Sequence, residues 1–451
     1  MNPRTSRLAF AVLLASSPAI AAEEVTSPAP WPSSGPAPIV SAEPSPKPMA
    51  AAANLPRCDA DNAGLTLPPG FCALVYASTF AHARHLVVTP DGDVIVAIGR
   101  SNDTSGGVMV LRDDNGDGRA DKQVQFDSRA GTGIGLFDGY LYFAPNDSVV
   151  RWPWPAGQLV PSGPAETIVS NLLFLPQHAA KSIAFGPGGA LYVNVGAPSN
   201  ACQDPDRTPG VAGRDPCPML ANGGGIWRFD AKRAGQTQAG GKRFATGLRN
   251  TVALAVHPRT GVLYGASHGR DGLSTLWPDL YDDKASAEGP AEEFFRIDEG
   301  DDLGWPYCYF DLALGRKILN PEYGGDAKTA GRCENVEKPA VAFPAHWAPI
   351  AIAFPTDSRW PEKYRDGAFV SFRGSWNRAP LPQDGYNVSF APFRGDAPTG
   401  AFETFAKGFA GETPTPRGPH RPTGIAFGPD GSMYVSDDTG GRIYRIVYRG
   451  D

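Results

Sequence analysis

Arginine residues recur at one kind of position in this sequence, next to short apolar segments separated by glycine and proline. A guanidinium group can bind a carboxylate through two parallel hydrogen bonds and can stack on a flat ring. Arginines that converge on one place can therefore hold an anionic ligand, and five of them are more than solubility requires. A surface or packing role remains the alternative for each one. The five are Arg84, Arg249, Arg373, Arg378 and Arg421.

His178 is the candidate general base. A neutral imidazole can remove a proton from a hydroxyl group near physiological pH. The competing interpretation is a structural histidine that is hydrogen-bonded near a strand. His178 lies just before an apolar segment that begins at Ser182.

These residues flank a repeated hairpin pattern. Ile183–Val193 reads IAFGPGGALYV and Ile425–Val435 reads IAFGPDGSMYV, so the two segments are nearly the same. Each consists of an apolar strand, a tight turn of Pro, Asp or Gly, and a second apolar strand, which is typical of a β-hairpin. Looser copies of the pattern are Leu86–Val96, Ile134–Phe143, Leu254–Tyr264 and Ile352–Val370.

Six such hairpins without a helical period predict an all-β fold, a six-bladed β-propeller. Small antiparallel sheets repeat around an axis because no single blade can bury its own faces. A β-sandwich or a β-helix is the alternative. Three long inserts are expected to form loops on one face, where propellers build their sites. They run from about Asn200 to Asn222, Leu273 to Glu299 and Cys308 to Val341.

The chain divides into three parts by composition. Arg4 and Arg7, an apolar run and the small residues that end at Ala21 predict a secretory signal peptide over residues 1–21. Residues 22–55 are rich in Pro, Ala and Ser and predict a flexible tether. Residues 56–451 are the expected propeller domain. We therefore expect a periplasmic or secreted protein.

Charge and cysteine content narrow the function. A net charge of -6 without a basic cluster argues against a nucleic-acid partner, and no segment after the signal peptide is apolar enough to span a membrane. The six cysteines form three pairs that are close in sequence, Cys58 with Cys72, Cys202 with Cys217 and Cys308 with Cys333. An exported chain with an even count favours three disulfides. The sequence contains no Cys-x-x-Cys-His motif that would attach a haem covalently. Any electron acceptor must therefore be a group that the protein binds.

From Pro68 to Tyr448 the sequence resembles the family of glucose and sorbosone dehydrogenases that depend on pyrroloquinoline quinone (PQQ). The resemblance rests on four stretches that occur in the family's order, each next to a hairpin repeat. They are Leu175-Pro176-Gln177-His178, Gly247-Leu248-Arg249-Asn250, Phe372-Arg373-Gly374-Ser375-Trp376-Asn377-Arg378 and Pro419-His420-Arg421-Pro422. The third stretch is more similar to the sorbosone branch of the family than to the glucose branch.

The resemblance implies roles for these residues. It makes His178 the catalytic base, and it assigns cofactor binding to the five arginines together with Asn250 and Asn377. PQQ is a flat tricarboxylate, which such arginines suit. In the family's glucose dehydrogenases an Asp after the next strand supports the histidine, but the turn here reads Gly196-Ala197-Pro198-Ser199. Another group must orient His178.

The resemblance also implies calcium. Main-chain carbonyl groups in the loop Ser267-His268-Gly269-Arg270-Asp271 would be its ligands, with Gly269 and Arg270 at the matching positions. His268 is a possible substrate contact. His346 and Trp347 are candidates for contact with the sugar, since an aromatic ring suits the apolar face of a sugar, although tryptophan also fills blade cores.

A second calcium candidate is the segment Asp113–Asp121, which reads DDNGDGRAD. Oxygen-bearing side chains alternate along it as in the first half of an EF-hand loop, but the distal Glu is missing. A solvated turn between strands is the alternative.

Together these features predict a quinoprotein that oxidises an aldose or a sorbosone-like ketoaldehyde and passes electrons to an external acceptor, a cytochrome or a quinone. The alternatives are a calcium-dependent lactonase or other hydrolase, because six-bladed propellers host these too, and a non-catalytic binding propeller.

Overall fold

The computed structural model describes residues 55–450 except 79–81, 101–104, 357–358, 412–414 and 416–417. The expected signal peptide and all but the last residue of the expected tether lie outside the described residues. The described residues belong to a single unit, Ala51–Asp451. Within them, no helix combines the length and the apolar character that crossing a membrane requires.

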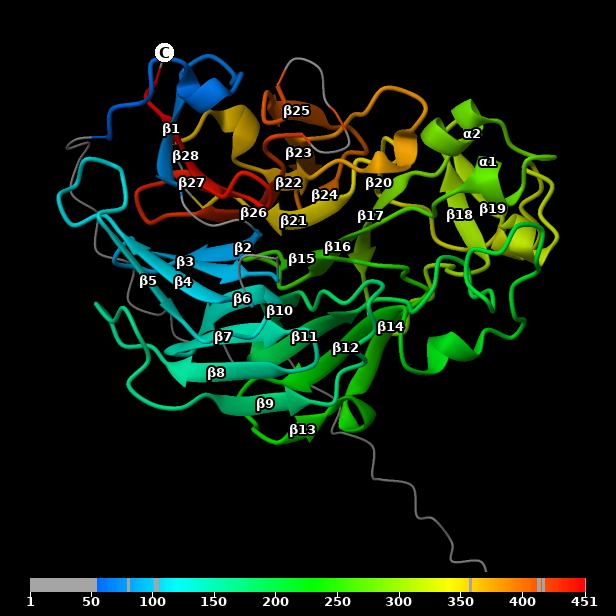
Figure 1. Ribbon diagram of the computed structural model, residues 1–451, viewed down its shortest axis with the longest axis horizontal. Coiled ribbons are helices and arrows are strands. Elements are labelled where there is room, and N and C mark those ends of the chain that lie inside the picture. Colours follow the sequence, from blue (N-terminus) through cyan, green and yellow to red (C-terminus); the bar gives the residue numbers. More distant parts are fainter. Residues whose placement is uncertain are drawn as a thin grey trace, which may run out of the picture. The chain divides into compact units, whose positions relative to one another are not determined.

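Six antiparallel sheets of four main strands make up the fold, as predicted (Figure 1). The first blade contains β2 (Ala83–Val88), β3 (Val94–Ile98), β4 (Gly107–Arg112) and β5 (Lys122–Phe126). The second contains β6 (Gly131–Phe137), β7 (Tyr140–Pro145), β8 (Val149–Pro153) and β9 (Glu166–Ser170), extended by β13 (Gln236–Thr237). The third contains β10 (Ile183–Gly186), β11 (Ala190–Val195), β12 (Gly225–Asp230) and β14 (Lys242–Thr246).

The remaining three blades follow the same plan. The fourth contains β15 (Ala253–Val256), β16 (Leu263–Ser267), β17 (Glu292–Ile297) and β20 (Val341–Phe343). The fifth contains β21 (Pro349–Ala353), β22 (Gly367–Phe372), β23 (Asn387–Arg394) and β25 (Glu403–Ala406), with β24 (Ala397–Pro398) on β23. The sixth contains β26 (Pro422–Phe427), β27 (Met433–Asp437), β28 (Arg442–Tyr448) and β1 (Phe71–Ser78).

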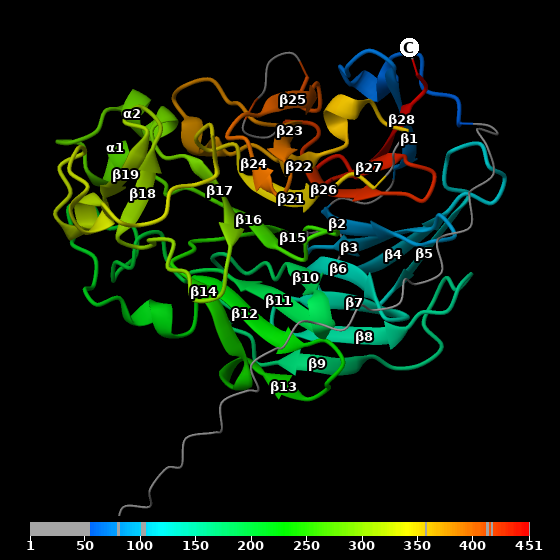
Figure 2. The ribbon, with the colours of Figure 1, turned by 180° about the vertical axis from the view of Figure 1, so that it is seen from behind.

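The first strands of the blades form a closed ring. In the order β2, β6, β10, β15, β21 and β26 each contacts the next, and β26 contacts β2. This order follows the colours from blue to red around the ring in Figures 1 and 2. The six predicted hairpins are the first two strands of the six blades. In five of them the predicted end residues are paired in the sheet, as Ile183 with Val193 and Ile425 with Val435.

The hydrophobic core is divided among the interfaces between blades. In β3, Val94, Val96 and Ile98 pack on the sixth blade, whereas Ile95 and Ala97 pack on the second. Alternate side chains of a strand point to opposite faces, so one strand serves two interfaces. An inner strand such as β3 is therefore apolar at every position, whereas the outer strand β5 is largely polar and exposed.

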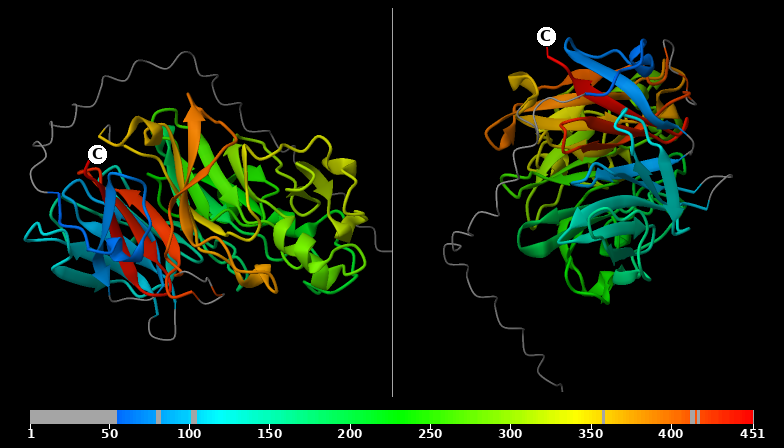
Figure 3. Two further views of the ribbon diagram at one scale, coloured as in Figure 1. Left: turned by 90° about the horizontal axis from the view of Figure 1, so that it is seen from above. Right: turned by 90° about the vertical axis from the view of Figure 1, so that its left-hand side faces the viewer.

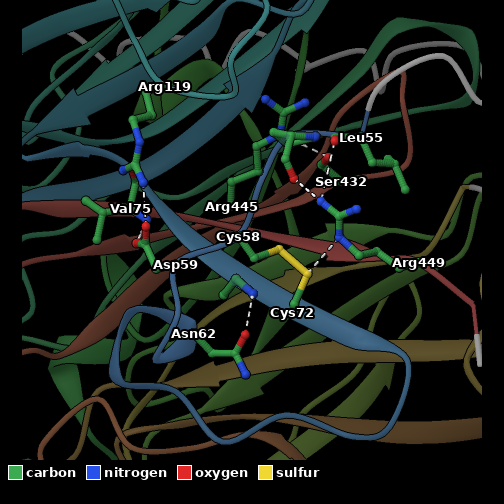
Figure 4. The surroundings of a disulfide bond; sticks show 12 residues. Leu55, Cys58, Asp59, Asn62, Cys72, Val75, Arg119, Ser432, Arg445 and Arg449 are labelled. Atoms are coloured by element: carbon green, nitrogen blue, oxygen red, sulfur yellow. Dashed lines mark hydrogen bonds and ion pairs between the residues drawn. A yellow bond between two sulfur atoms is a disulfide. The ribbon is translucent and has the colours of Figure 1, made fainter.

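The sixth blade closes the ring with both ends of the domain. Strand β1 pairs with β28, from Phe71 opposite Tyr448 to Ser78 opposite Arg442 (Figure 3). The Cys58–Cys72 disulfide ties the preceding segment to β1, and Arg449 Nε lies 3.2 Å from Cys72 Sγ (Figure 4). The disulfides Cys202–Cys217 and Cys308–Cys333 also form, so the predicted pairing is confirmed.

The inserts gather beside the fourth blade. Helices α1 (Leu273–Leu276) and α2 (Asp283–Glu288) share a small core with the hairpin β18 (Cys308–Asp311) and β19 (Arg316–Leu319) (Figure 2). One boundary was wrong, because the expected insert from Leu273 to Glu299 contains β17. The charged residues Glu292, Glu293 and Arg296 obscure the apolar pattern of this strand in the sequence. Its residues Phe294, Phe295 and Ile297 are nevertheless buried.

Short 3-10 turns complete the described structure. They are η1 (Asn62–Gly64), η2 (Pro187–Gly189), η3 (Pro218–Ala221), η4 (Gln238–Gly240), η5 (Pro321–Tyr323), η6 (Gly331–Cys333), η7 (Glu362–Tyr364) and η8 (Trp376–Arg378).

Candidate functional site

The predicted site residues share one end of the propeller. In each hairpin the residues before the first strand lie beside those after the second, as the pairing of Pro349 with Phe372 and of Pro422 with Asp437 shows. His178, Arg249 and Arg421 come before first strands, and His268 and Arg373 follow second strands. We call this end of the propeller the site end.

His178 is held as a neutral base. Its Nδ1 lies 2.7 Å from the carbonyl oxygen of Ala197, which can only accept, so Nδ1 carries the proton and Nε2 keeps its lone pair. Burial, and then the positive charge of Arg249, hold the pKa of His178 well below its usual value. A backbone carbonyl thus orients His178. It belongs to the turn where the family's glucose dehydrogenases, by the resemblance, have an Asp side chain.

Gly196 makes this arrangement possible. A Cβ at this position would lie 2.6 Å from Cβ of His178 and 3.0 Å from Oδ1 of Asn250. The chain after β11 therefore approaches His178 more closely than any other residue type would allow.

Asp271 is the hub of the site, and sequence reasoning gave it no role. Its Oδ2 accepts from Arg249 at 2.6 Å and from Arg207 at 2.8 Å, and its Oδ1 accepts from Asn377 at 2.8 Å. Nδ1 of His346 lies 3.8 Å from Oδ1. Burial alone would raise the pKa of Asp271, but Arg249 and Arg207 hold it far below the ordinary range.

Both terminal nitrogens of Arg249 donate to protein groups, whereas its buried Nε has no hydrogen-bond partner. Besides Asp271, its guanidinium donates to the carbonyl of Gly269 at 2.9 Å and to Oδ1 of Asn200 at 3.0 Å. Only 5% of the side chain is exposed. Arg249 therefore acts in this structure as a fixed internal charge.

Asn250 and His268 form a short relay. Nε2 of His268 donates to the carbonyl of Pro349 at 2.8 Å, so Nδ1 is left to accept from the Asn250 amide at 3.2 Å. Burial, and also Arg249, lower the pKa of His268 to about 4, which keeps the ring neutral. Asp271 raises this pKa and Arg373 lowers it, so His268 feels charges of both signs.

Three of the predicted arginines surround Asp438, and we call them with Asp438 the arginine cluster. Nη1 of Arg84 and Nε of Arg373 lie 3.2 and 2.8 Å from the same oxygen of Asp438. Arg421 donates to the carbonyls of Arg373 and Gly374, at 2.8 and 2.6 Å. Burial would raise the pKa of Asp438, but all three arginines lower it. Asp437 is a second carboxylate beside Arg421, so three guanidinium groups against two carboxylates leave one positive charge in excess.

Arg378 points to backbone groups instead. Its guanidinium donates to the carbonyls of Ala287 and Ala345, at 3.1 and 3.3 Å, and Nε donates to that of Pro382 at 3.0 Å. It therefore fastens the loop after β22 to neighbouring loops.

Gly269 and Arg270, the predicted calcium ligands, lie in a loop rich in charge. The N–H of Gly269 donates to Glu292 at 2.9 Å, and the guanidinium of Arg270 forms a buried ion pair with Glu322 at 2.6 Å. Across the described part of the chain, no three His, Cys, Asp or Glu side chains are grouped to hold a metal. Calcium at this loop would depend on backbone carbonyls.

His346 and Trp347 are both buried. His346 Nε2 lies 2.9 Å from the carbonyl of Ser286. The Trp347 ring, 7% exposed, packs on Phe372 and Phe402 with centroid distances of 5.2 and 5.9 Å. This placement favours the core-filling alternative for Trp347.

The segment Asp113–Asp121 forms the turn between β4 and β5, away from the site end. Asp113 accepts from the N–H groups of Gly116 and Gly118, at 2.7 and 2.8 Å, and Asp121 accepts from that of Asp114 at 2.8 Å. Its carboxylates serve the turn itself, which favours the solvated-turn alternative.

Comparison with known proteins agrees with this fold. A family model described as TrAA12-like matches residues 65–449. A pyrroloquinoline quinone-dependent sugar dehydrogenase of Hypocrea jecorina is 25% identical over 223 residues, which are 46% of this chain and 48% of that protein. A pyrroloquinoline quinone-dependent pyranose dehydrogenase of Coprinopsis cinerea is 25% identical over 241 residues, 46% of this chain and 31% of that protein. The match thus spans about half or less of these relatives.

Solved structures share the architecture. The calcium structure of a Trichoderma reesei family AA12 protein has a TM-score of 0.69 and 18% identity, covering 85% of this chain and 97% of that one. The holo PQQ domain of pyranose dehydrogenase from Coprinopsis cinerea has a TM-score of 0.67 and 18% identity, covering 88% and 98%. At such identity these structures bear on the fold, and they agree with the propeller.

Proposed function

The chain belongs to the TrAA12-like family, and from this premise we propose that it is a PQQ-dependent dehydrogenase of sugars. The proposed substrate is an aldose or a sorbosone-like ketoaldehyde. The observation that carries the proposal is the excess positive charge of the arginine cluster at the same end as a neutral histidine.

The arginine cluster suits the carboxylates of PQQ. Arg84, Arg373 and Arg421 offer more positive charge than Asp438 neutralises, and a buried excess of charge favours an anionic ligand. Burial, and then the neighbouring Arg373, lower the pKa of Arg84 to about 10, as expected for cations held close together. A tricarboxylate would relieve this repulsion.

His178 supplies the base. Bound PQQ would supply an acceptor for the hydride of the sugar carbon, and Nε2 of His178 would receive the proton of the hydroxyl group on that carbon. An aldose that loses this hydride and this proton becomes a lactone, so electrons and atoms balance. The low pKa of His178 keeps Nε2 free at neutral pH.

The other predicted cofactor residues support the site through protein contacts. Arg249 and Asn377 are fixed by Asp271, and Arg378 by backbone carbonyls. The amide of Asn250 gives one N–H to His268 and retains a second N–H for a quinone oxygen.

Calcium belongs to the proposal as a Lewis acid held by the carbonyls of Gly269 and Arg270. The Gly269 carbonyl accepts one bond from Arg249 and keeps a second lone pair. His268 stays a candidate substrate contact, and His346 stays one through its position beside Asp271.

The external electron acceptor, a cytochrome or a quinone, is also part of the proposal, as is a periplasmic or extracellular location. Three disulfides favour an oxidising compartment. A hydrolase would need carboxylates converging on a metal, whereas Asp271 faces two guanidinium groups.

The test is dye reduction by the purified protein with PQQ and calcium added singly and together, against a panel of aldoses and osones. We expect turnover that requires PQQ and disappears in His178→Ala, while PQQ still binds by absorbance titration. His257→Ala is the control, because His257 is a buried histidine at the opposite end of the fourth blade.

Two outcomes would contradict the proposal. Absence of PQQ binding by the wild type would remove the cofactor and bring the lactonase and binding-propeller alternatives forward. Full turnover in His178→Ala would remove the base.

A further inference from the structure

Trp376 is the most exposed large apolar side chain in the described part of the chain, with 67% of its surface accessible. It follows β22 and forms the start of η8, at the site end. An isolated exposed apolar residue needs no explanation in general. Its setting is what makes Trp376 unusual.

The two residues that follow Trp376 are anchored. Ser375 accepts at 3.2 Å from the N–H of Asn377, and the Asn377 side chain donates to the Asp271 hub at 2.8 Å. Arg378 is fixed to the carbonyls of Ala287 and Ala345. The two residues after Trp376 are thus tied to the interior by their side chains, while the ring itself remains at the surface.

The same turn is tied to the arginine cluster. Arg421 donates to the carbonyl of Gly374 at 2.6 Å, and Gly374 adopts a φ of 67°. A Cβ on Gly374 would lie 2.4 Å from the ring of Tyr386, so only glycine fits this approach. Trp376 is therefore two residues from a contact of the arginine cluster and one residue from a contact of the Asp271 hub.

We propose that Trp376 is the aromatic platform on which the sugar ring lies, an inference that rests on the proposed function. The C–H face of a pyranose is apolar and packs on an aromatic face, while its hydroxyl groups need polar partners. Because its backbone is fixed in advance, the indole loses little freedom on binding. The buried Trp347 cannot offer a face of this kind.

The experiment compares Trp376→Ala with the wild type in three measurements: KM and kcat for the sugar, the affinity for PQQ, and calorimetric binding of the sugar to cofactor-free protein. We expect KM to rise about tenfold, the usual scale for losing one aromatic contact. We expect kcat and PQQ affinity to stay within about twofold on the same grounds. Trp376→Phe should recover much of the loss.

Leu314→Ala is the matched control. Leu314 is also exposed, at 42%, but lies in the turn of the β18–β19 hairpin. We expect it to leave all three quantities unchanged. Since both side chains are exposed, both variants should fold, which circular dichroism checks.

Every other outcome either supports or overturns the inference. If Trp376→Ala weakens PQQ binding and leaves KM unchanged, the ring serves the cofactor and the sugar assignment is wrong. If nothing changes, Trp376 is no platform. If the wild type fails to bind PQQ, the proposed function fails, and the calorimetric arm then decides on Trp376 alone: sugar binding that is lost in Trp376→Ala upholds the platform, and its absence from the wild type overturns it.

Discussion

At the scale of single residues, the site depends on a neutral histidine held by a carbonyl group. A carbonyl fixes the tautomer of His178 but carries no full negative charge, so it stabilises the protonated ring less than a carboxylate would. Arg249 lowers the pKa further. The base is therefore weak but available in acid solution.

This arrangement predicts the pH dependence of turnover. A base is active when unprotonated, so a pKa below 6.5 places the acidic limb of kcat/KM below that value. In Arg249→Gln the positive charge is lost, the pKa of His178 rises, and the limb moves to higher pH. Rate profiles between about pH 4.5 and 8 test this expectation.

Arg249→Lys serves as the control, because it keeps the charge and should keep the limb in place. An unchanged limb in Arg249→Gln, with PQQ still bound, would mean that burial alone sets the basicity of His178.

At the scale of elements, loops from different blades meet at Asp271. Arg249 precedes β15, Asn377 lies in η8, His346 precedes β21, and Arg207 comes from the insert after β11. One buried carboxylate thus fixes the relative positions of segments that are far apart in the sequence.

Removing this charge should therefore destabilise the protein. In Asp271→Asn two guanidinium groups lose their counter-ion, and the loss of one partner of a buried pair costs about 3–5 kcal/mol. Urea denaturation should show this loss. Asp366→Asn, which breaks the exposed pair with Arg259, should cost about 1 kcal/mol or less. Equal effects in the two variants would show that Asp271 does not act as a hub.

Repetition explains what the sequence could predict. The Ile183 and Ile425 segments predict their hairpins because alternate apolar side chains must fill the interfaces on both sides of a blade. The end on which His178 and the arginines gather follows from hairpin geometry alone. The Asp271 hub could not be predicted in this way, because Asp271 belongs to no repeated motif. No sequence spacing connects it with its partners Arg207 and Asn377. The sequence likewise could not distinguish Trp347 from Trp376, since both are tryptophans next to polar residues. Only the structure shows that Trp347 is buried and Trp376 is exposed.

At the scale of the whole molecule, two disulfides of similar span have different surroundings. Cys58–Cys72 spans 14 residues at the closure of the ring, and Cys202–Cys217 spans 15 residues in the insert that reaches the site. Ala197 and Cys202 share one small core, and Arg207 reaches Asp271.

Their removal should separate stability from function. Replacing either pair by serines should lower the free energy of unfolding by about 3 kcal/mol, as expected for loops of this length. Only the loss of Cys202–Cys217 should also raise KM for the sugar, because it frees the segment around Asn200 and Arg207. Urea denaturation and steady-state kinetics of both variants check this. A matching rise of KM in the Cys58 and Cys72 variant would contradict it.

The pairing of β1 with β28 has a consequence for the order in which the molecule can be completed. Among the described strands the ribosome makes β1 before, and β28 after, those of the other five blades, so the sixth blade cannot form until those blades have been synthesised. Until Arg442–Tyr448 has emerged, β1 presents an open edge and the ring stays unsealed. A chain interrupted before Arg442 would lack the partner of its own first strand, however complete its other five blades.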